Sequence, residues 1–262
     1  MEELLRYDHV QVCFNGRPVV HDVTFSLKQG EILGIAGESG SGKSTLLRAA
    51  MGLLGPTAMV TRGDIWFDGM NLLDLSQRRL NRIRGRRLGM IFQDAGASLC
   101  PIRKIGSQIC EAMGARTRSS KAAVHTRTMA LFEKMNLNHG DRIWNSYPFE
   151  LSGGMNQRVC IAIAILMGPD ILLGDEPTSA LDARVQKQMI EEILKLRDEQ
   201  HMSVIIVSHD IGVIKAMADT VMILKGGHVM EYGPANQVLA CPRNDYTKLL
   251  LKAVPRLVKP GA

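Results

Sequence analysis

The chain has 262 residues, a net charge of +6 and 45% hydrophobic residues, enough apolar material for the core of one large domain. No apolar run reaches the roughly 18 residues of a membrane-spanning helix, and the acidic start Met1–Leu5 does not fit a secretory signal. The charge alone does not choose between nucleotide phosphates, an anionic membrane surface and nucleic acid. The five cysteines lack C-x-x-C spacing, so we expect reduced thiols rather than disulfides or a zinc site.

The first part of the chain shows a strand pattern. Apolar residues alternate over Val10–Phe14 and again over Val23–Leu27, and the Asn15–Gly16 pair between them predicts a hairpin turn. An apolar run at 31–36 then predicts a buried strand, and residues 45–51 predict a helix. This part of the chain therefore predicts a β-hairpin followed by a strand and a helix.

The next stretch is dominated by arginine. Residues 52–62 show no period and are expected to be irregular, and glycines bound a short strand at 63–69. The segment 76–87 then carries six arginines: Arg78, Arg79, Arg82, Arg84, Arg86 and Arg87. We interpret them as a solvated helix face, with contact to lipid headgroups as the alternative. No aromatic residue lies between them, which argues against a single-stranded nucleic-acid site.

The remaining chain alternates between strand and helix patterns. A strand at 88–92 is followed by a mainly helical insertion at about 94–167. Beyond it, strands are expected at 171–175, 204–207, 221–224 and 229–231, with helices at 183–199 and 211–217 and frayed residues at 256–262. Continuous apolar strands separated by helices predict a parallel sheet covered on both faces, hence an α/β fold.

A glycine-rich loop lies between the strand at 31–36 and the helix that follows. Its residues are Gly37, Glu38, Ser39, Gly40, Ser41, Gly42, Lys43 and Ser44, which fit the phosphate-binding pattern G-x-x-x-x-G-K-[ST]. Glycines let backbone N–H groups approach phosphate oxygens, Lys43 supplies a charge for the β- and γ-phosphates, and the Ser44 hydroxyl suits Mg²⁺. A chance glycine-rich turn is the alternative, which the flanking strand and helix disfavour.

Polar residues follow three of the expected strands. Asp175 and Glu176 end an apolar run, and ligands bind at the carboxyl edge of parallel sheets. Asp175 suits a Mg²⁺ ligand, and Glu176 a general base for the attacking water. Gln93 and His209 follow strands that end at the same edge. Gln93 could hold Mg²⁺ or the water, and His209 could reach a γ-phosphate. An acidic helix start and a merely structural histidine are the alternatives.

A second anion site is predicted at Leu151–Arg158. Ser152 is a good N-cap, and Gly153 and Gly154 leave helix N–H groups exposed. An ordinary capped helix start is the alternative interpretation. One chain that binds one nucleotide has no evident need for two anion sites.

Together these motifs resemble the nucleotide-binding subunit of ABC transporters over about Leu4–Pro255. The resemblance implies a P-loop NTPase fold with a mainly parallel core sheet, an antiparallel β subdomain and a helical subdomain at about 94–167, all within one nucleotide-binding domain spanning 1–262. In this family two cassettes pair head to tail, so the second anion site would serve the partner's ATP.

The resemblance also assigns site residues. Glu176, His209 and Lys43 would be catalytic. ATP would be bound by Phe14, Gly37, Glu38, Ser39, Gly40, Ser41, Gly42, Lys43, Ser44, Thr45, Gln93, Ser152, Gly153, Gly154 and Asp182, and Mg²⁺ by Ser44, Gln93 and Asp175. Phe14 would stack on adenine, with a core position as the alternative, and Asp182 would couple the two sites.

Three details resemble the oligopeptide, dipeptide and nickel importers within this family. They are Met155 in the family's signature segment Leu151–Arg158, the residues Arg82–Gly85 ahead of Ile91–Asp94, and the segment Asp245–Pro255. Cys100 stands where the family usually has Asn, which leaves the local loop contacts open. The short C-terminal segment carries only Cys241, so we expect no iron–sulfur cluster and a nickel or metallophore cargo rather than a peptide, with the cargo left open.

The implied function is ATP hydrolysis that powers a bacterial importer at the cytoplasmic face of the inner membrane. Implied partners are a second ATPase subunit (expected to be a paralogue), two permease subunits and an extracytoplasmic solute-binding protein, with no nucleic acid. A soluble ABC-type ATPase, a regulatory cassette and another P-loop enzyme such as a kinase are the alternatives.

Overall fold

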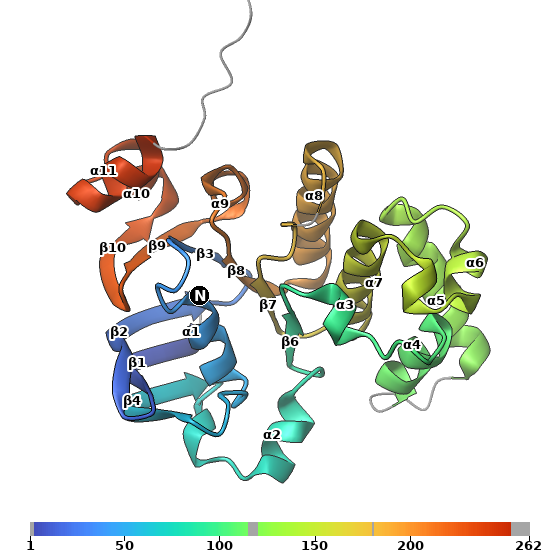
Figure 1. The fold of residues 1–262 in the computed structure, drawn as a ribbon, viewed down its shortest axis with the longest axis horizontal. Helices are drawn as coiled ribbons and strands as arrows, with labels where there is room; N and C mark the ends of the chain where they lie inside the picture. Colours follow the sequence, from blue (N-terminus) through green and yellow to red (C-terminus); the bar gives the residue numbers. More distant parts are fainter. Residues whose placement is uncertain (1–2, 115–119, 180, 253–262) are drawn as a thin grey trace, which may run out of the picture.

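The computed structural model describes residues 3–114, 120–179 and 181–252 and contains two sheets (Figure 1). An antiparallel sheet has the order β2 (Arg17–Lys28), β1 (Glu3–Phe14), β4 (Ala58–Phe67) and β5 (Met70–Asn71). A six-stranded sheet has the order β10 (His228–Pro234), β9 (Thr220–Lys225), β3 (Ile32–Gly37), β8 (Ser203–Val207), β7 (Ile171–Asp175) and β6 (Leu88–Ile91). Its strands are parallel except β10, which confirms the expected mainly parallel core sheet.

The hairpin between β1 and β2 forms at the expected turn. Asn15 and Gly16 both have positive φ, 47° and 76°, as a two-residue hairpin turn of this kind requires. Phe14 pairs with Arg17 across it.

The expectation of irregular backbone at 52–62 is wrong from Ala58 onward, where β4 begins. Only Ile65 and Phe67 of β4 are fully buried, and Met59 is 64% exposed, so the strand shows little hydrophobic alternation. Its pairing with β1, which sets Val60 opposite Val12, holds it in the sheet. Pairing with the neighbouring strand thus stabilises β4, although its own sequence pattern does not predict a strand.

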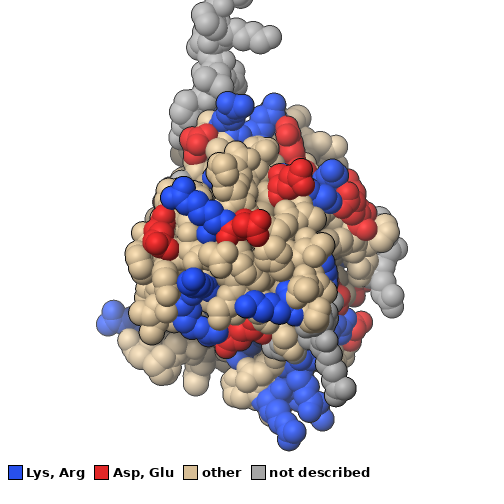
Figure 2. Space-filling model, turned by 90° about the vertical axis from the view of Figure 1, so that its right-hand side faces the viewer, with Lys and Arg blue, Asp and Glu red and all other residues tan. Residues whose placement is uncertain are grey.

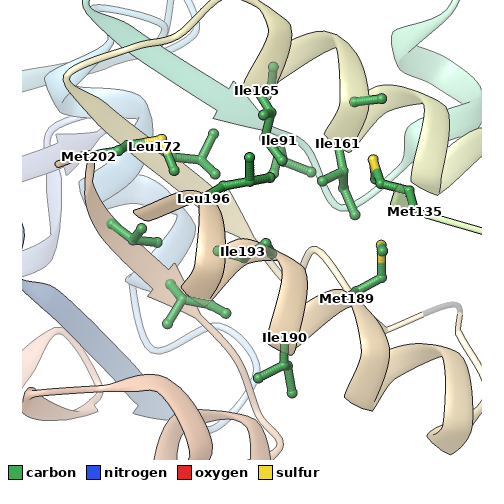
Figure 3. Close-up of a cluster of buried hydrophobic side chains, with 14 of the residues drawn as sticks. Ile91, Met135, Ile161, Ile165, Leu172, Met189, Ile190, Ile193, Leu196 and Met202 are labelled. Carbon is green, nitrogen blue, oxygen red and sulfur yellow. The ribbon is translucent and has the colours of Figure 1, made fainter. Parts of the chain in front are cut away.

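The parallel strands bury both faces. On β3, Leu33 and Ile35 join the core under the antiparallel sheet and α1 (Lys43–Ala50), whereas Ile32 and Ala36 join the core on the opposite face. Figure 3 shows that opposite core, in which side chains of α7 (Gly153–Leu166) and α8 (Ala183–Gln200) meet those of β6 and β7. The labelled residues are Ile91, Met135, Ile161, Ile165, Leu172, Met189, Ile190, Ile193, Leu196 and Met202.

In the described residues between β6 and β7, the regular elements are all helical and none is a strand. Figure 1 shows them on the side away from the antiparallel sheet: α3 (Ala95–Ser98), α4 (Ile105–Gly114), α5 (Lys121–Lys134), α6 (Gly140–Asn145), a 3₁₀ turn (Pro148–Glu150) and α7. The other elements are a 3₁₀ turn (Leu72–Asp74), α2 (Gln77–Ile83), α9 (Ile211–Met217), α10 (Ala235–Ala240) and α11 (Asp245–Lys252). Within the described ranges, no helix is long and apolar enough to cross a membrane. The end expected to fray, 256–262, lies outside the described residues.

The arginine run is not uniformly solvated. Figure 2 shows Lys and Arg side chains gathered at the lower end of the molecule, where α2 lies in Figure 1. Arg78, Arg79, Arg82 and Arg86 are exposed. Arg87, however, pairs with Asp170 at 2.6 Å and Asp68 at 2.9 Å, and Arg84 donates to backbone carbonyls beyond α1. A helix-face interpretation missed these contacts because it considers only residues on the same helix.

Candidate functional site

The glycine-rich loop joins β3 to α1, whose first residue is Lys43. Gly42 precedes the helix with φ +98°, and a Cβ there would lie 3.0 Å from Val20 Cγ2. This left-handed conformation and close approach explain the glycine. The loop therefore ends at a helix N-terminus, where N–H groups without intrahelical partners favour anions.

Lys43 is held at the centre of this loop. Its side chain is buried, and Nζ donates to the carbonyls of Gly37 at 2.8 Å and Glu38 at 2.7 Å. Burial lowers the pKa of Lys43, while the negative charges of Glu176, Asp175 and Glu38 oppose this shift. The ammonium group thus lies beside the helix start, bound to loop carbonyls, where its positive charge can attract an anion.

Asp175 ends β7 directly beside the start of α1. Ser44 donates its hydroxyl to Asp175 Oδ1 at 2.6 Å, and the other carboxylate oxygen, Oδ2, is buried without a hydrogen-bond partner among the described residues. Burial raises the pKa of Asp175, against the lowering effects of Ser44, Arg48 and Lys43. A serine hydroxyl and a buried carboxylate with a spare oxygen form a donor set that fits Mg²⁺.

Glu176 meets side chains that follow two other strands. Its Oε2 lies 3.0 Å from His209 Nδ1 and 3.5 Å from Gln93 Nε2. The Glu176 side chain is only 15% exposed, whereas that of His209 is 64% exposed. The structure therefore brings Gln93, Glu176 and His209 together at one edge of the parallel sheet.

Gln93 and Glu176 border an open cavity of about 240 Å³, whereas His209 is not part of its lining. It is lined by Phe14, Val19, Ser39, Gly40, Ser41, Gly42, Lys43, Ser44, Thr45, Gln93 and Glu176. Phe14 is 36% exposed at the end of β1, so it is a wall of the cavity rather than a core residue. An exposed ring beside a phosphate-binding loop suits stacking on a nucleotide base.

The remaining predicted residues lie apart from this cavity. Ser152 caps α7, where its Oγ accepts from Met155 N at 3.3 Å, and Gly153 and Gly154 form the first turn. Asp182 caps α8 through bonds from Arg184 N and Val185 N. The Ser152 cap is the one that the sequence predicts, whereas the Asp182 cap was not predicted, and within one chain none of these residues lines the cavity.

Three residues at the site were missed. Val19 lines the cavity, Gln157 donates to the Glu176 carbonyl at 3.5 Å, and the Tyr246 hydroxyl accepts from Glu38 N at 3.3 Å. Gln157 lies within the predicted signature segment 151–158, so the sequence indicated its segment but not its hydrogen bond to Glu176. No sequence pattern links Val19 or Tyr246 to the loop, because both reach it through tertiary packing.

A family model described as ABC transporter matches residues 20–179 of this chain. The chain belongs to the ABC transporter family. It is an ABC-type ATPase that binds nucleotide and hydrolyses ATP, and the resemblance drawn from its motifs is confirmed.

Relatives of this cassette are oligopeptide transport ATP-binding proteins. OppD of Salmonella typhimurium is 40% identical over 243 residues, which cover 93% of this chain and 72% of the relative. AmiE of Streptococcus pneumoniae is 40% identical over 91% of this chain and 67% of the relative. The chain thus aligns with most, but not all, of each relative.

Solved structures share the fold. The dimeric structure of MJ0796, described as a bacterial ABC transporter cassette, superposes with a TM-score of 0.80 at 29% identity, covering 88% of this chain and 99% of that one. CbiO1 of Clostridium perfringens, at 24% identity and a TM-score of 0.78, supports the fold alone. Both agree with the fold class expected from the sequence.

Proposed function

We propose that this cassette powers peptide uptake by a bacterial ABC importer. The proposed cargo rests on the 40% identity, over 93% of the chain, to an oligopeptide transport ATP-binding protein. These relatives favour di- or oligopeptides over nickel or a metal chelate, the cargo that we expected from the sequence. Residues 1–262 form a single nucleotide-binding domain in this proposal, with a helical subdomain at about 94–167.

ATP binds in the cavity at the glycine-rich loop. Phe14 stacks on adenine, Lys43 leaves the loop carbonyls to contact the β- and γ-phosphates, and N–H groups of the loop and of the first turn through Thr45 hold the remaining oxygens. Glu176 accepts the proton of the attacking water, and His209 orients that carboxylate and contacts the γ-phosphate. The 3.0 Å approach of His209 Nδ1 to Glu176 Oε2 supports this pairing of roles.

Mg²⁺ is held by the Ser44 hydroxyl, the Asp175 carboxylate and Gln93. When bound, the ion neutralises charge that develops on the phosphates. The buried Asp175 Oδ2, which has no hydrogen-bond partner within the described part of the chain, supports this assignment.

The importer is a larger assembly in which this chain has protein partners. A second ATPase subunit, expected to be a paralogue, contributes its own signature to the ATP bound here, while Ser152, Gly153 and Gly154 of this chain contact the ATP of that partner. Asp182 couples the two sites. Two permeases and an extracytoplasmic solute-binding protein complete the importer. The cassette then lies on the cytoplasmic face of the membrane, bound to the permeases. No nucleic acid is among the proposed partners.

Uptake by the complete transporter, reconstituted in lipid vesicles, tests the cargo. A labelled dipeptide, a labelled longer peptide, free nickel and chelated nickel are offered in parallel, with and without internal ATP. We expect ATP-dependent accumulation of peptide that is lost when this chain carries Glu176→Gln. Uptake of nickel without peptide, or of neither, would overturn the peptide proposal and leave the ATPase assignment intact.

A further inference from the structure

Arg84 follows α2 in the sequence, yet its guanidinium group lies at the far end of the helix that begins at Lys43. Its Nε donates to the carbonyl of Met51 at 2.6 Å, and its Nη2 donates to the carbonyl of Gly52 at 2.7 Å. Met51 is the C-cap of α1. A cation thus binds free carbonyl groups where the helix dipole is negative, an arrangement that stabilises a helix end.

The guanidinium group is itself held in place. Its Nη1 donates to Asn81 Oδ1 at 3.0 Å and to Gln77 Oε1 at 3.3 Å, both on α2. All three nitrogens are therefore engaged, in the planar fork that distinguishes arginine from lysine. The contact joins α2 to the C-terminus of α1.

Gly52 makes room for this contact. Its φ is +57°, and a Cβ at this position would lie 2.9 Å from Arg84 Nη2 and 3.0 Å from Leu80 Cδ1. Any side chain at residue 52 would therefore strain the backbone and push the guanidinium away. The glycine and the arginine form one unit at this helix end.

We propose that Arg84 is a positioning residue for the nucleotide site, acting through α1. This helix has eight residues, and its first turn carries Lys43 and Ser44. A short helix moves as a rigid rod, so the clamp at its C-terminus fixes where its N-terminus presents the ammonium and hydroxyl groups to phosphate. The inference concerns ATP binding by this chain and is independent of the cargo.

The test is the affinity of the purified full-length chain for a fluorescent ATP analogue, measured well below the melting temperature of every variant. Arg84→Ala is expected to weaken binding about three- to tenfold. Arg84→Lys should recover only part of this loss, because one ammonium group does not reproduce the two-pronged contact. Arg82→Ala, which removes an exposed arginine of α2, is the matched control and should leave the affinity unchanged.

A second measurement separates positioning from simple stabilisation. Gly52→Ala should weaken ATP binding in the wild-type background, but much less in the Arg84→Ala background, since the contact that it disturbs is already absent. Free guanidinium at low concentration should partly restore binding to Arg84→Ala and not to Gly52→Ala. Unchanged ATP affinity in Arg84→Ala with a lowered melting temperature would overturn the proposal, as would additive effects of the two substitutions.

Discussion

Two side chains from different parts of the sequence, His209 and Gln93, converge on the Glu176 carboxylate at this site. Glu176 has a positive φ of 49°, an uncommon conformation for a residue other than glycine. Its carboxylate lies among the side chains of His209 and Gln93, and its carbonyl accepts from the Ser179 hydroxyl at 3.0 Å. Such a backbone position persists only where surrounding contacts fix it, so the geometry of Glu176 is set by the site as a whole.

Replacing Glu176 by Gln tests its role as general base. The amide keeps the size of the side chain but cannot accept the proton of water, so hydrolysis is expected to fall at least about 100-fold. ATP affinity should stay within about twofold of the wild-type value, because the substitution leaves intact the phosphate contacts proposed for Lys43 and the loop. Phosphate release and nucleotide titration measure the two quantities.

Glu191→Gln, on the exposed face of α8, is the control for this substitution and should change neither quantity. Near-normal turnover in Glu176→Gln would remove Glu176 from the role of base.

At the scale of single elements, the sequence predicted the features that depend on a few neighbouring residues, such as helix caps and tight turns. Ser152 was identified as an N-cap from its neighbours alone, and Asn15–Gly16 as a hairpin turn. The start of β4 at Ala58 was missed because its partner strand, not its own pattern, holds it. Tyr246 was missed at the site for the same reason, since a hydrogen bond across the fold carries no sequence period.

Gly106 allows two helices of the helical segment, α4 and α6, to pack closely together. It lies on α4 against Trp144 of α6, and a Cβ at this position would lie 2.3 Å from Trp144 Cε2. Gly106→Ala is therefore expected to lower the free energy of unfolding by about 1–3 kcal/mol, measured by urea denaturation.

Gly114→Ala, at the exposed end of the same helix, is the control for Gly106→Ala. Apart from its chain neighbours and its own helix backbone, no atom of the described residues would lie within 4 Å of the added Cβ, so this substitution should be neutral or slightly stabilising. Equal losses of stability at the two positions would show that the tight contact with Trp144 is not the cause.

Glu231 anchors the last helices to the sheet. It lies on β10 and accepts from Arg243 N at 2.9 Å and Asn244 N at 3.2 Å, just before α11. Partial burial would raise the pKa of Glu231, but these backbone N–H groups and the charge of Arg243 outweigh it and hold the pKa below its ordinary value of about 4.5. The carboxylate therefore stabilises the fold above that pH, and the contribution is lost as the pH falls through the lowered pKa.

Glu231→Gln should accordingly cost about 0.5–1 kcal/mol of unfolding free energy at pH 7, a small value because the group is partly exposed. The difference from wild type should shrink once the pH falls below the lowered pKa of Glu231, where the wild-type side chain is also neutral. Denaturation curves at pH 7 and at acidic pH measure both. A loss that stayed the same at all pH values would contradict the role of the charge.

At the scale of the whole molecule, only some of the predicted ATP-binding residues line the cavity. The loop, Phe14, Gln93 and Glu176 border it, whereas Ser152 lies at the start of α7, outside its lining. The sequence predicted both anion sites but could not predict their separation, which depends on how the helical segment packs beside the sheet. Two sites that do not meet within one chain are what a head-to-tail pair of cassettes requires.

Ser152→Arg tests this arrangement. A long charged side chain at the exposed start of α7 should block the approach of a partner cassette, while ATP affinity of the same chain should stay within about twofold, because Ser152 does not line its cavity. Light scattering with ATP, in a Glu176→Gln background expected to slow hydrolysis, measures pairing of the chain with itself or with the proposed second ATPase subunit. Ser120→Arg is the control: Ser120 caps α5 in the same way, through Ala123 N at 3.2 Å, so it loses a similar cap, worth about 1 kcal/mol, without affecting pairing. Loss of ATP from the mutated chain's own site would show that the signature acts within one chain and that the head-to-tail assignment is wrong.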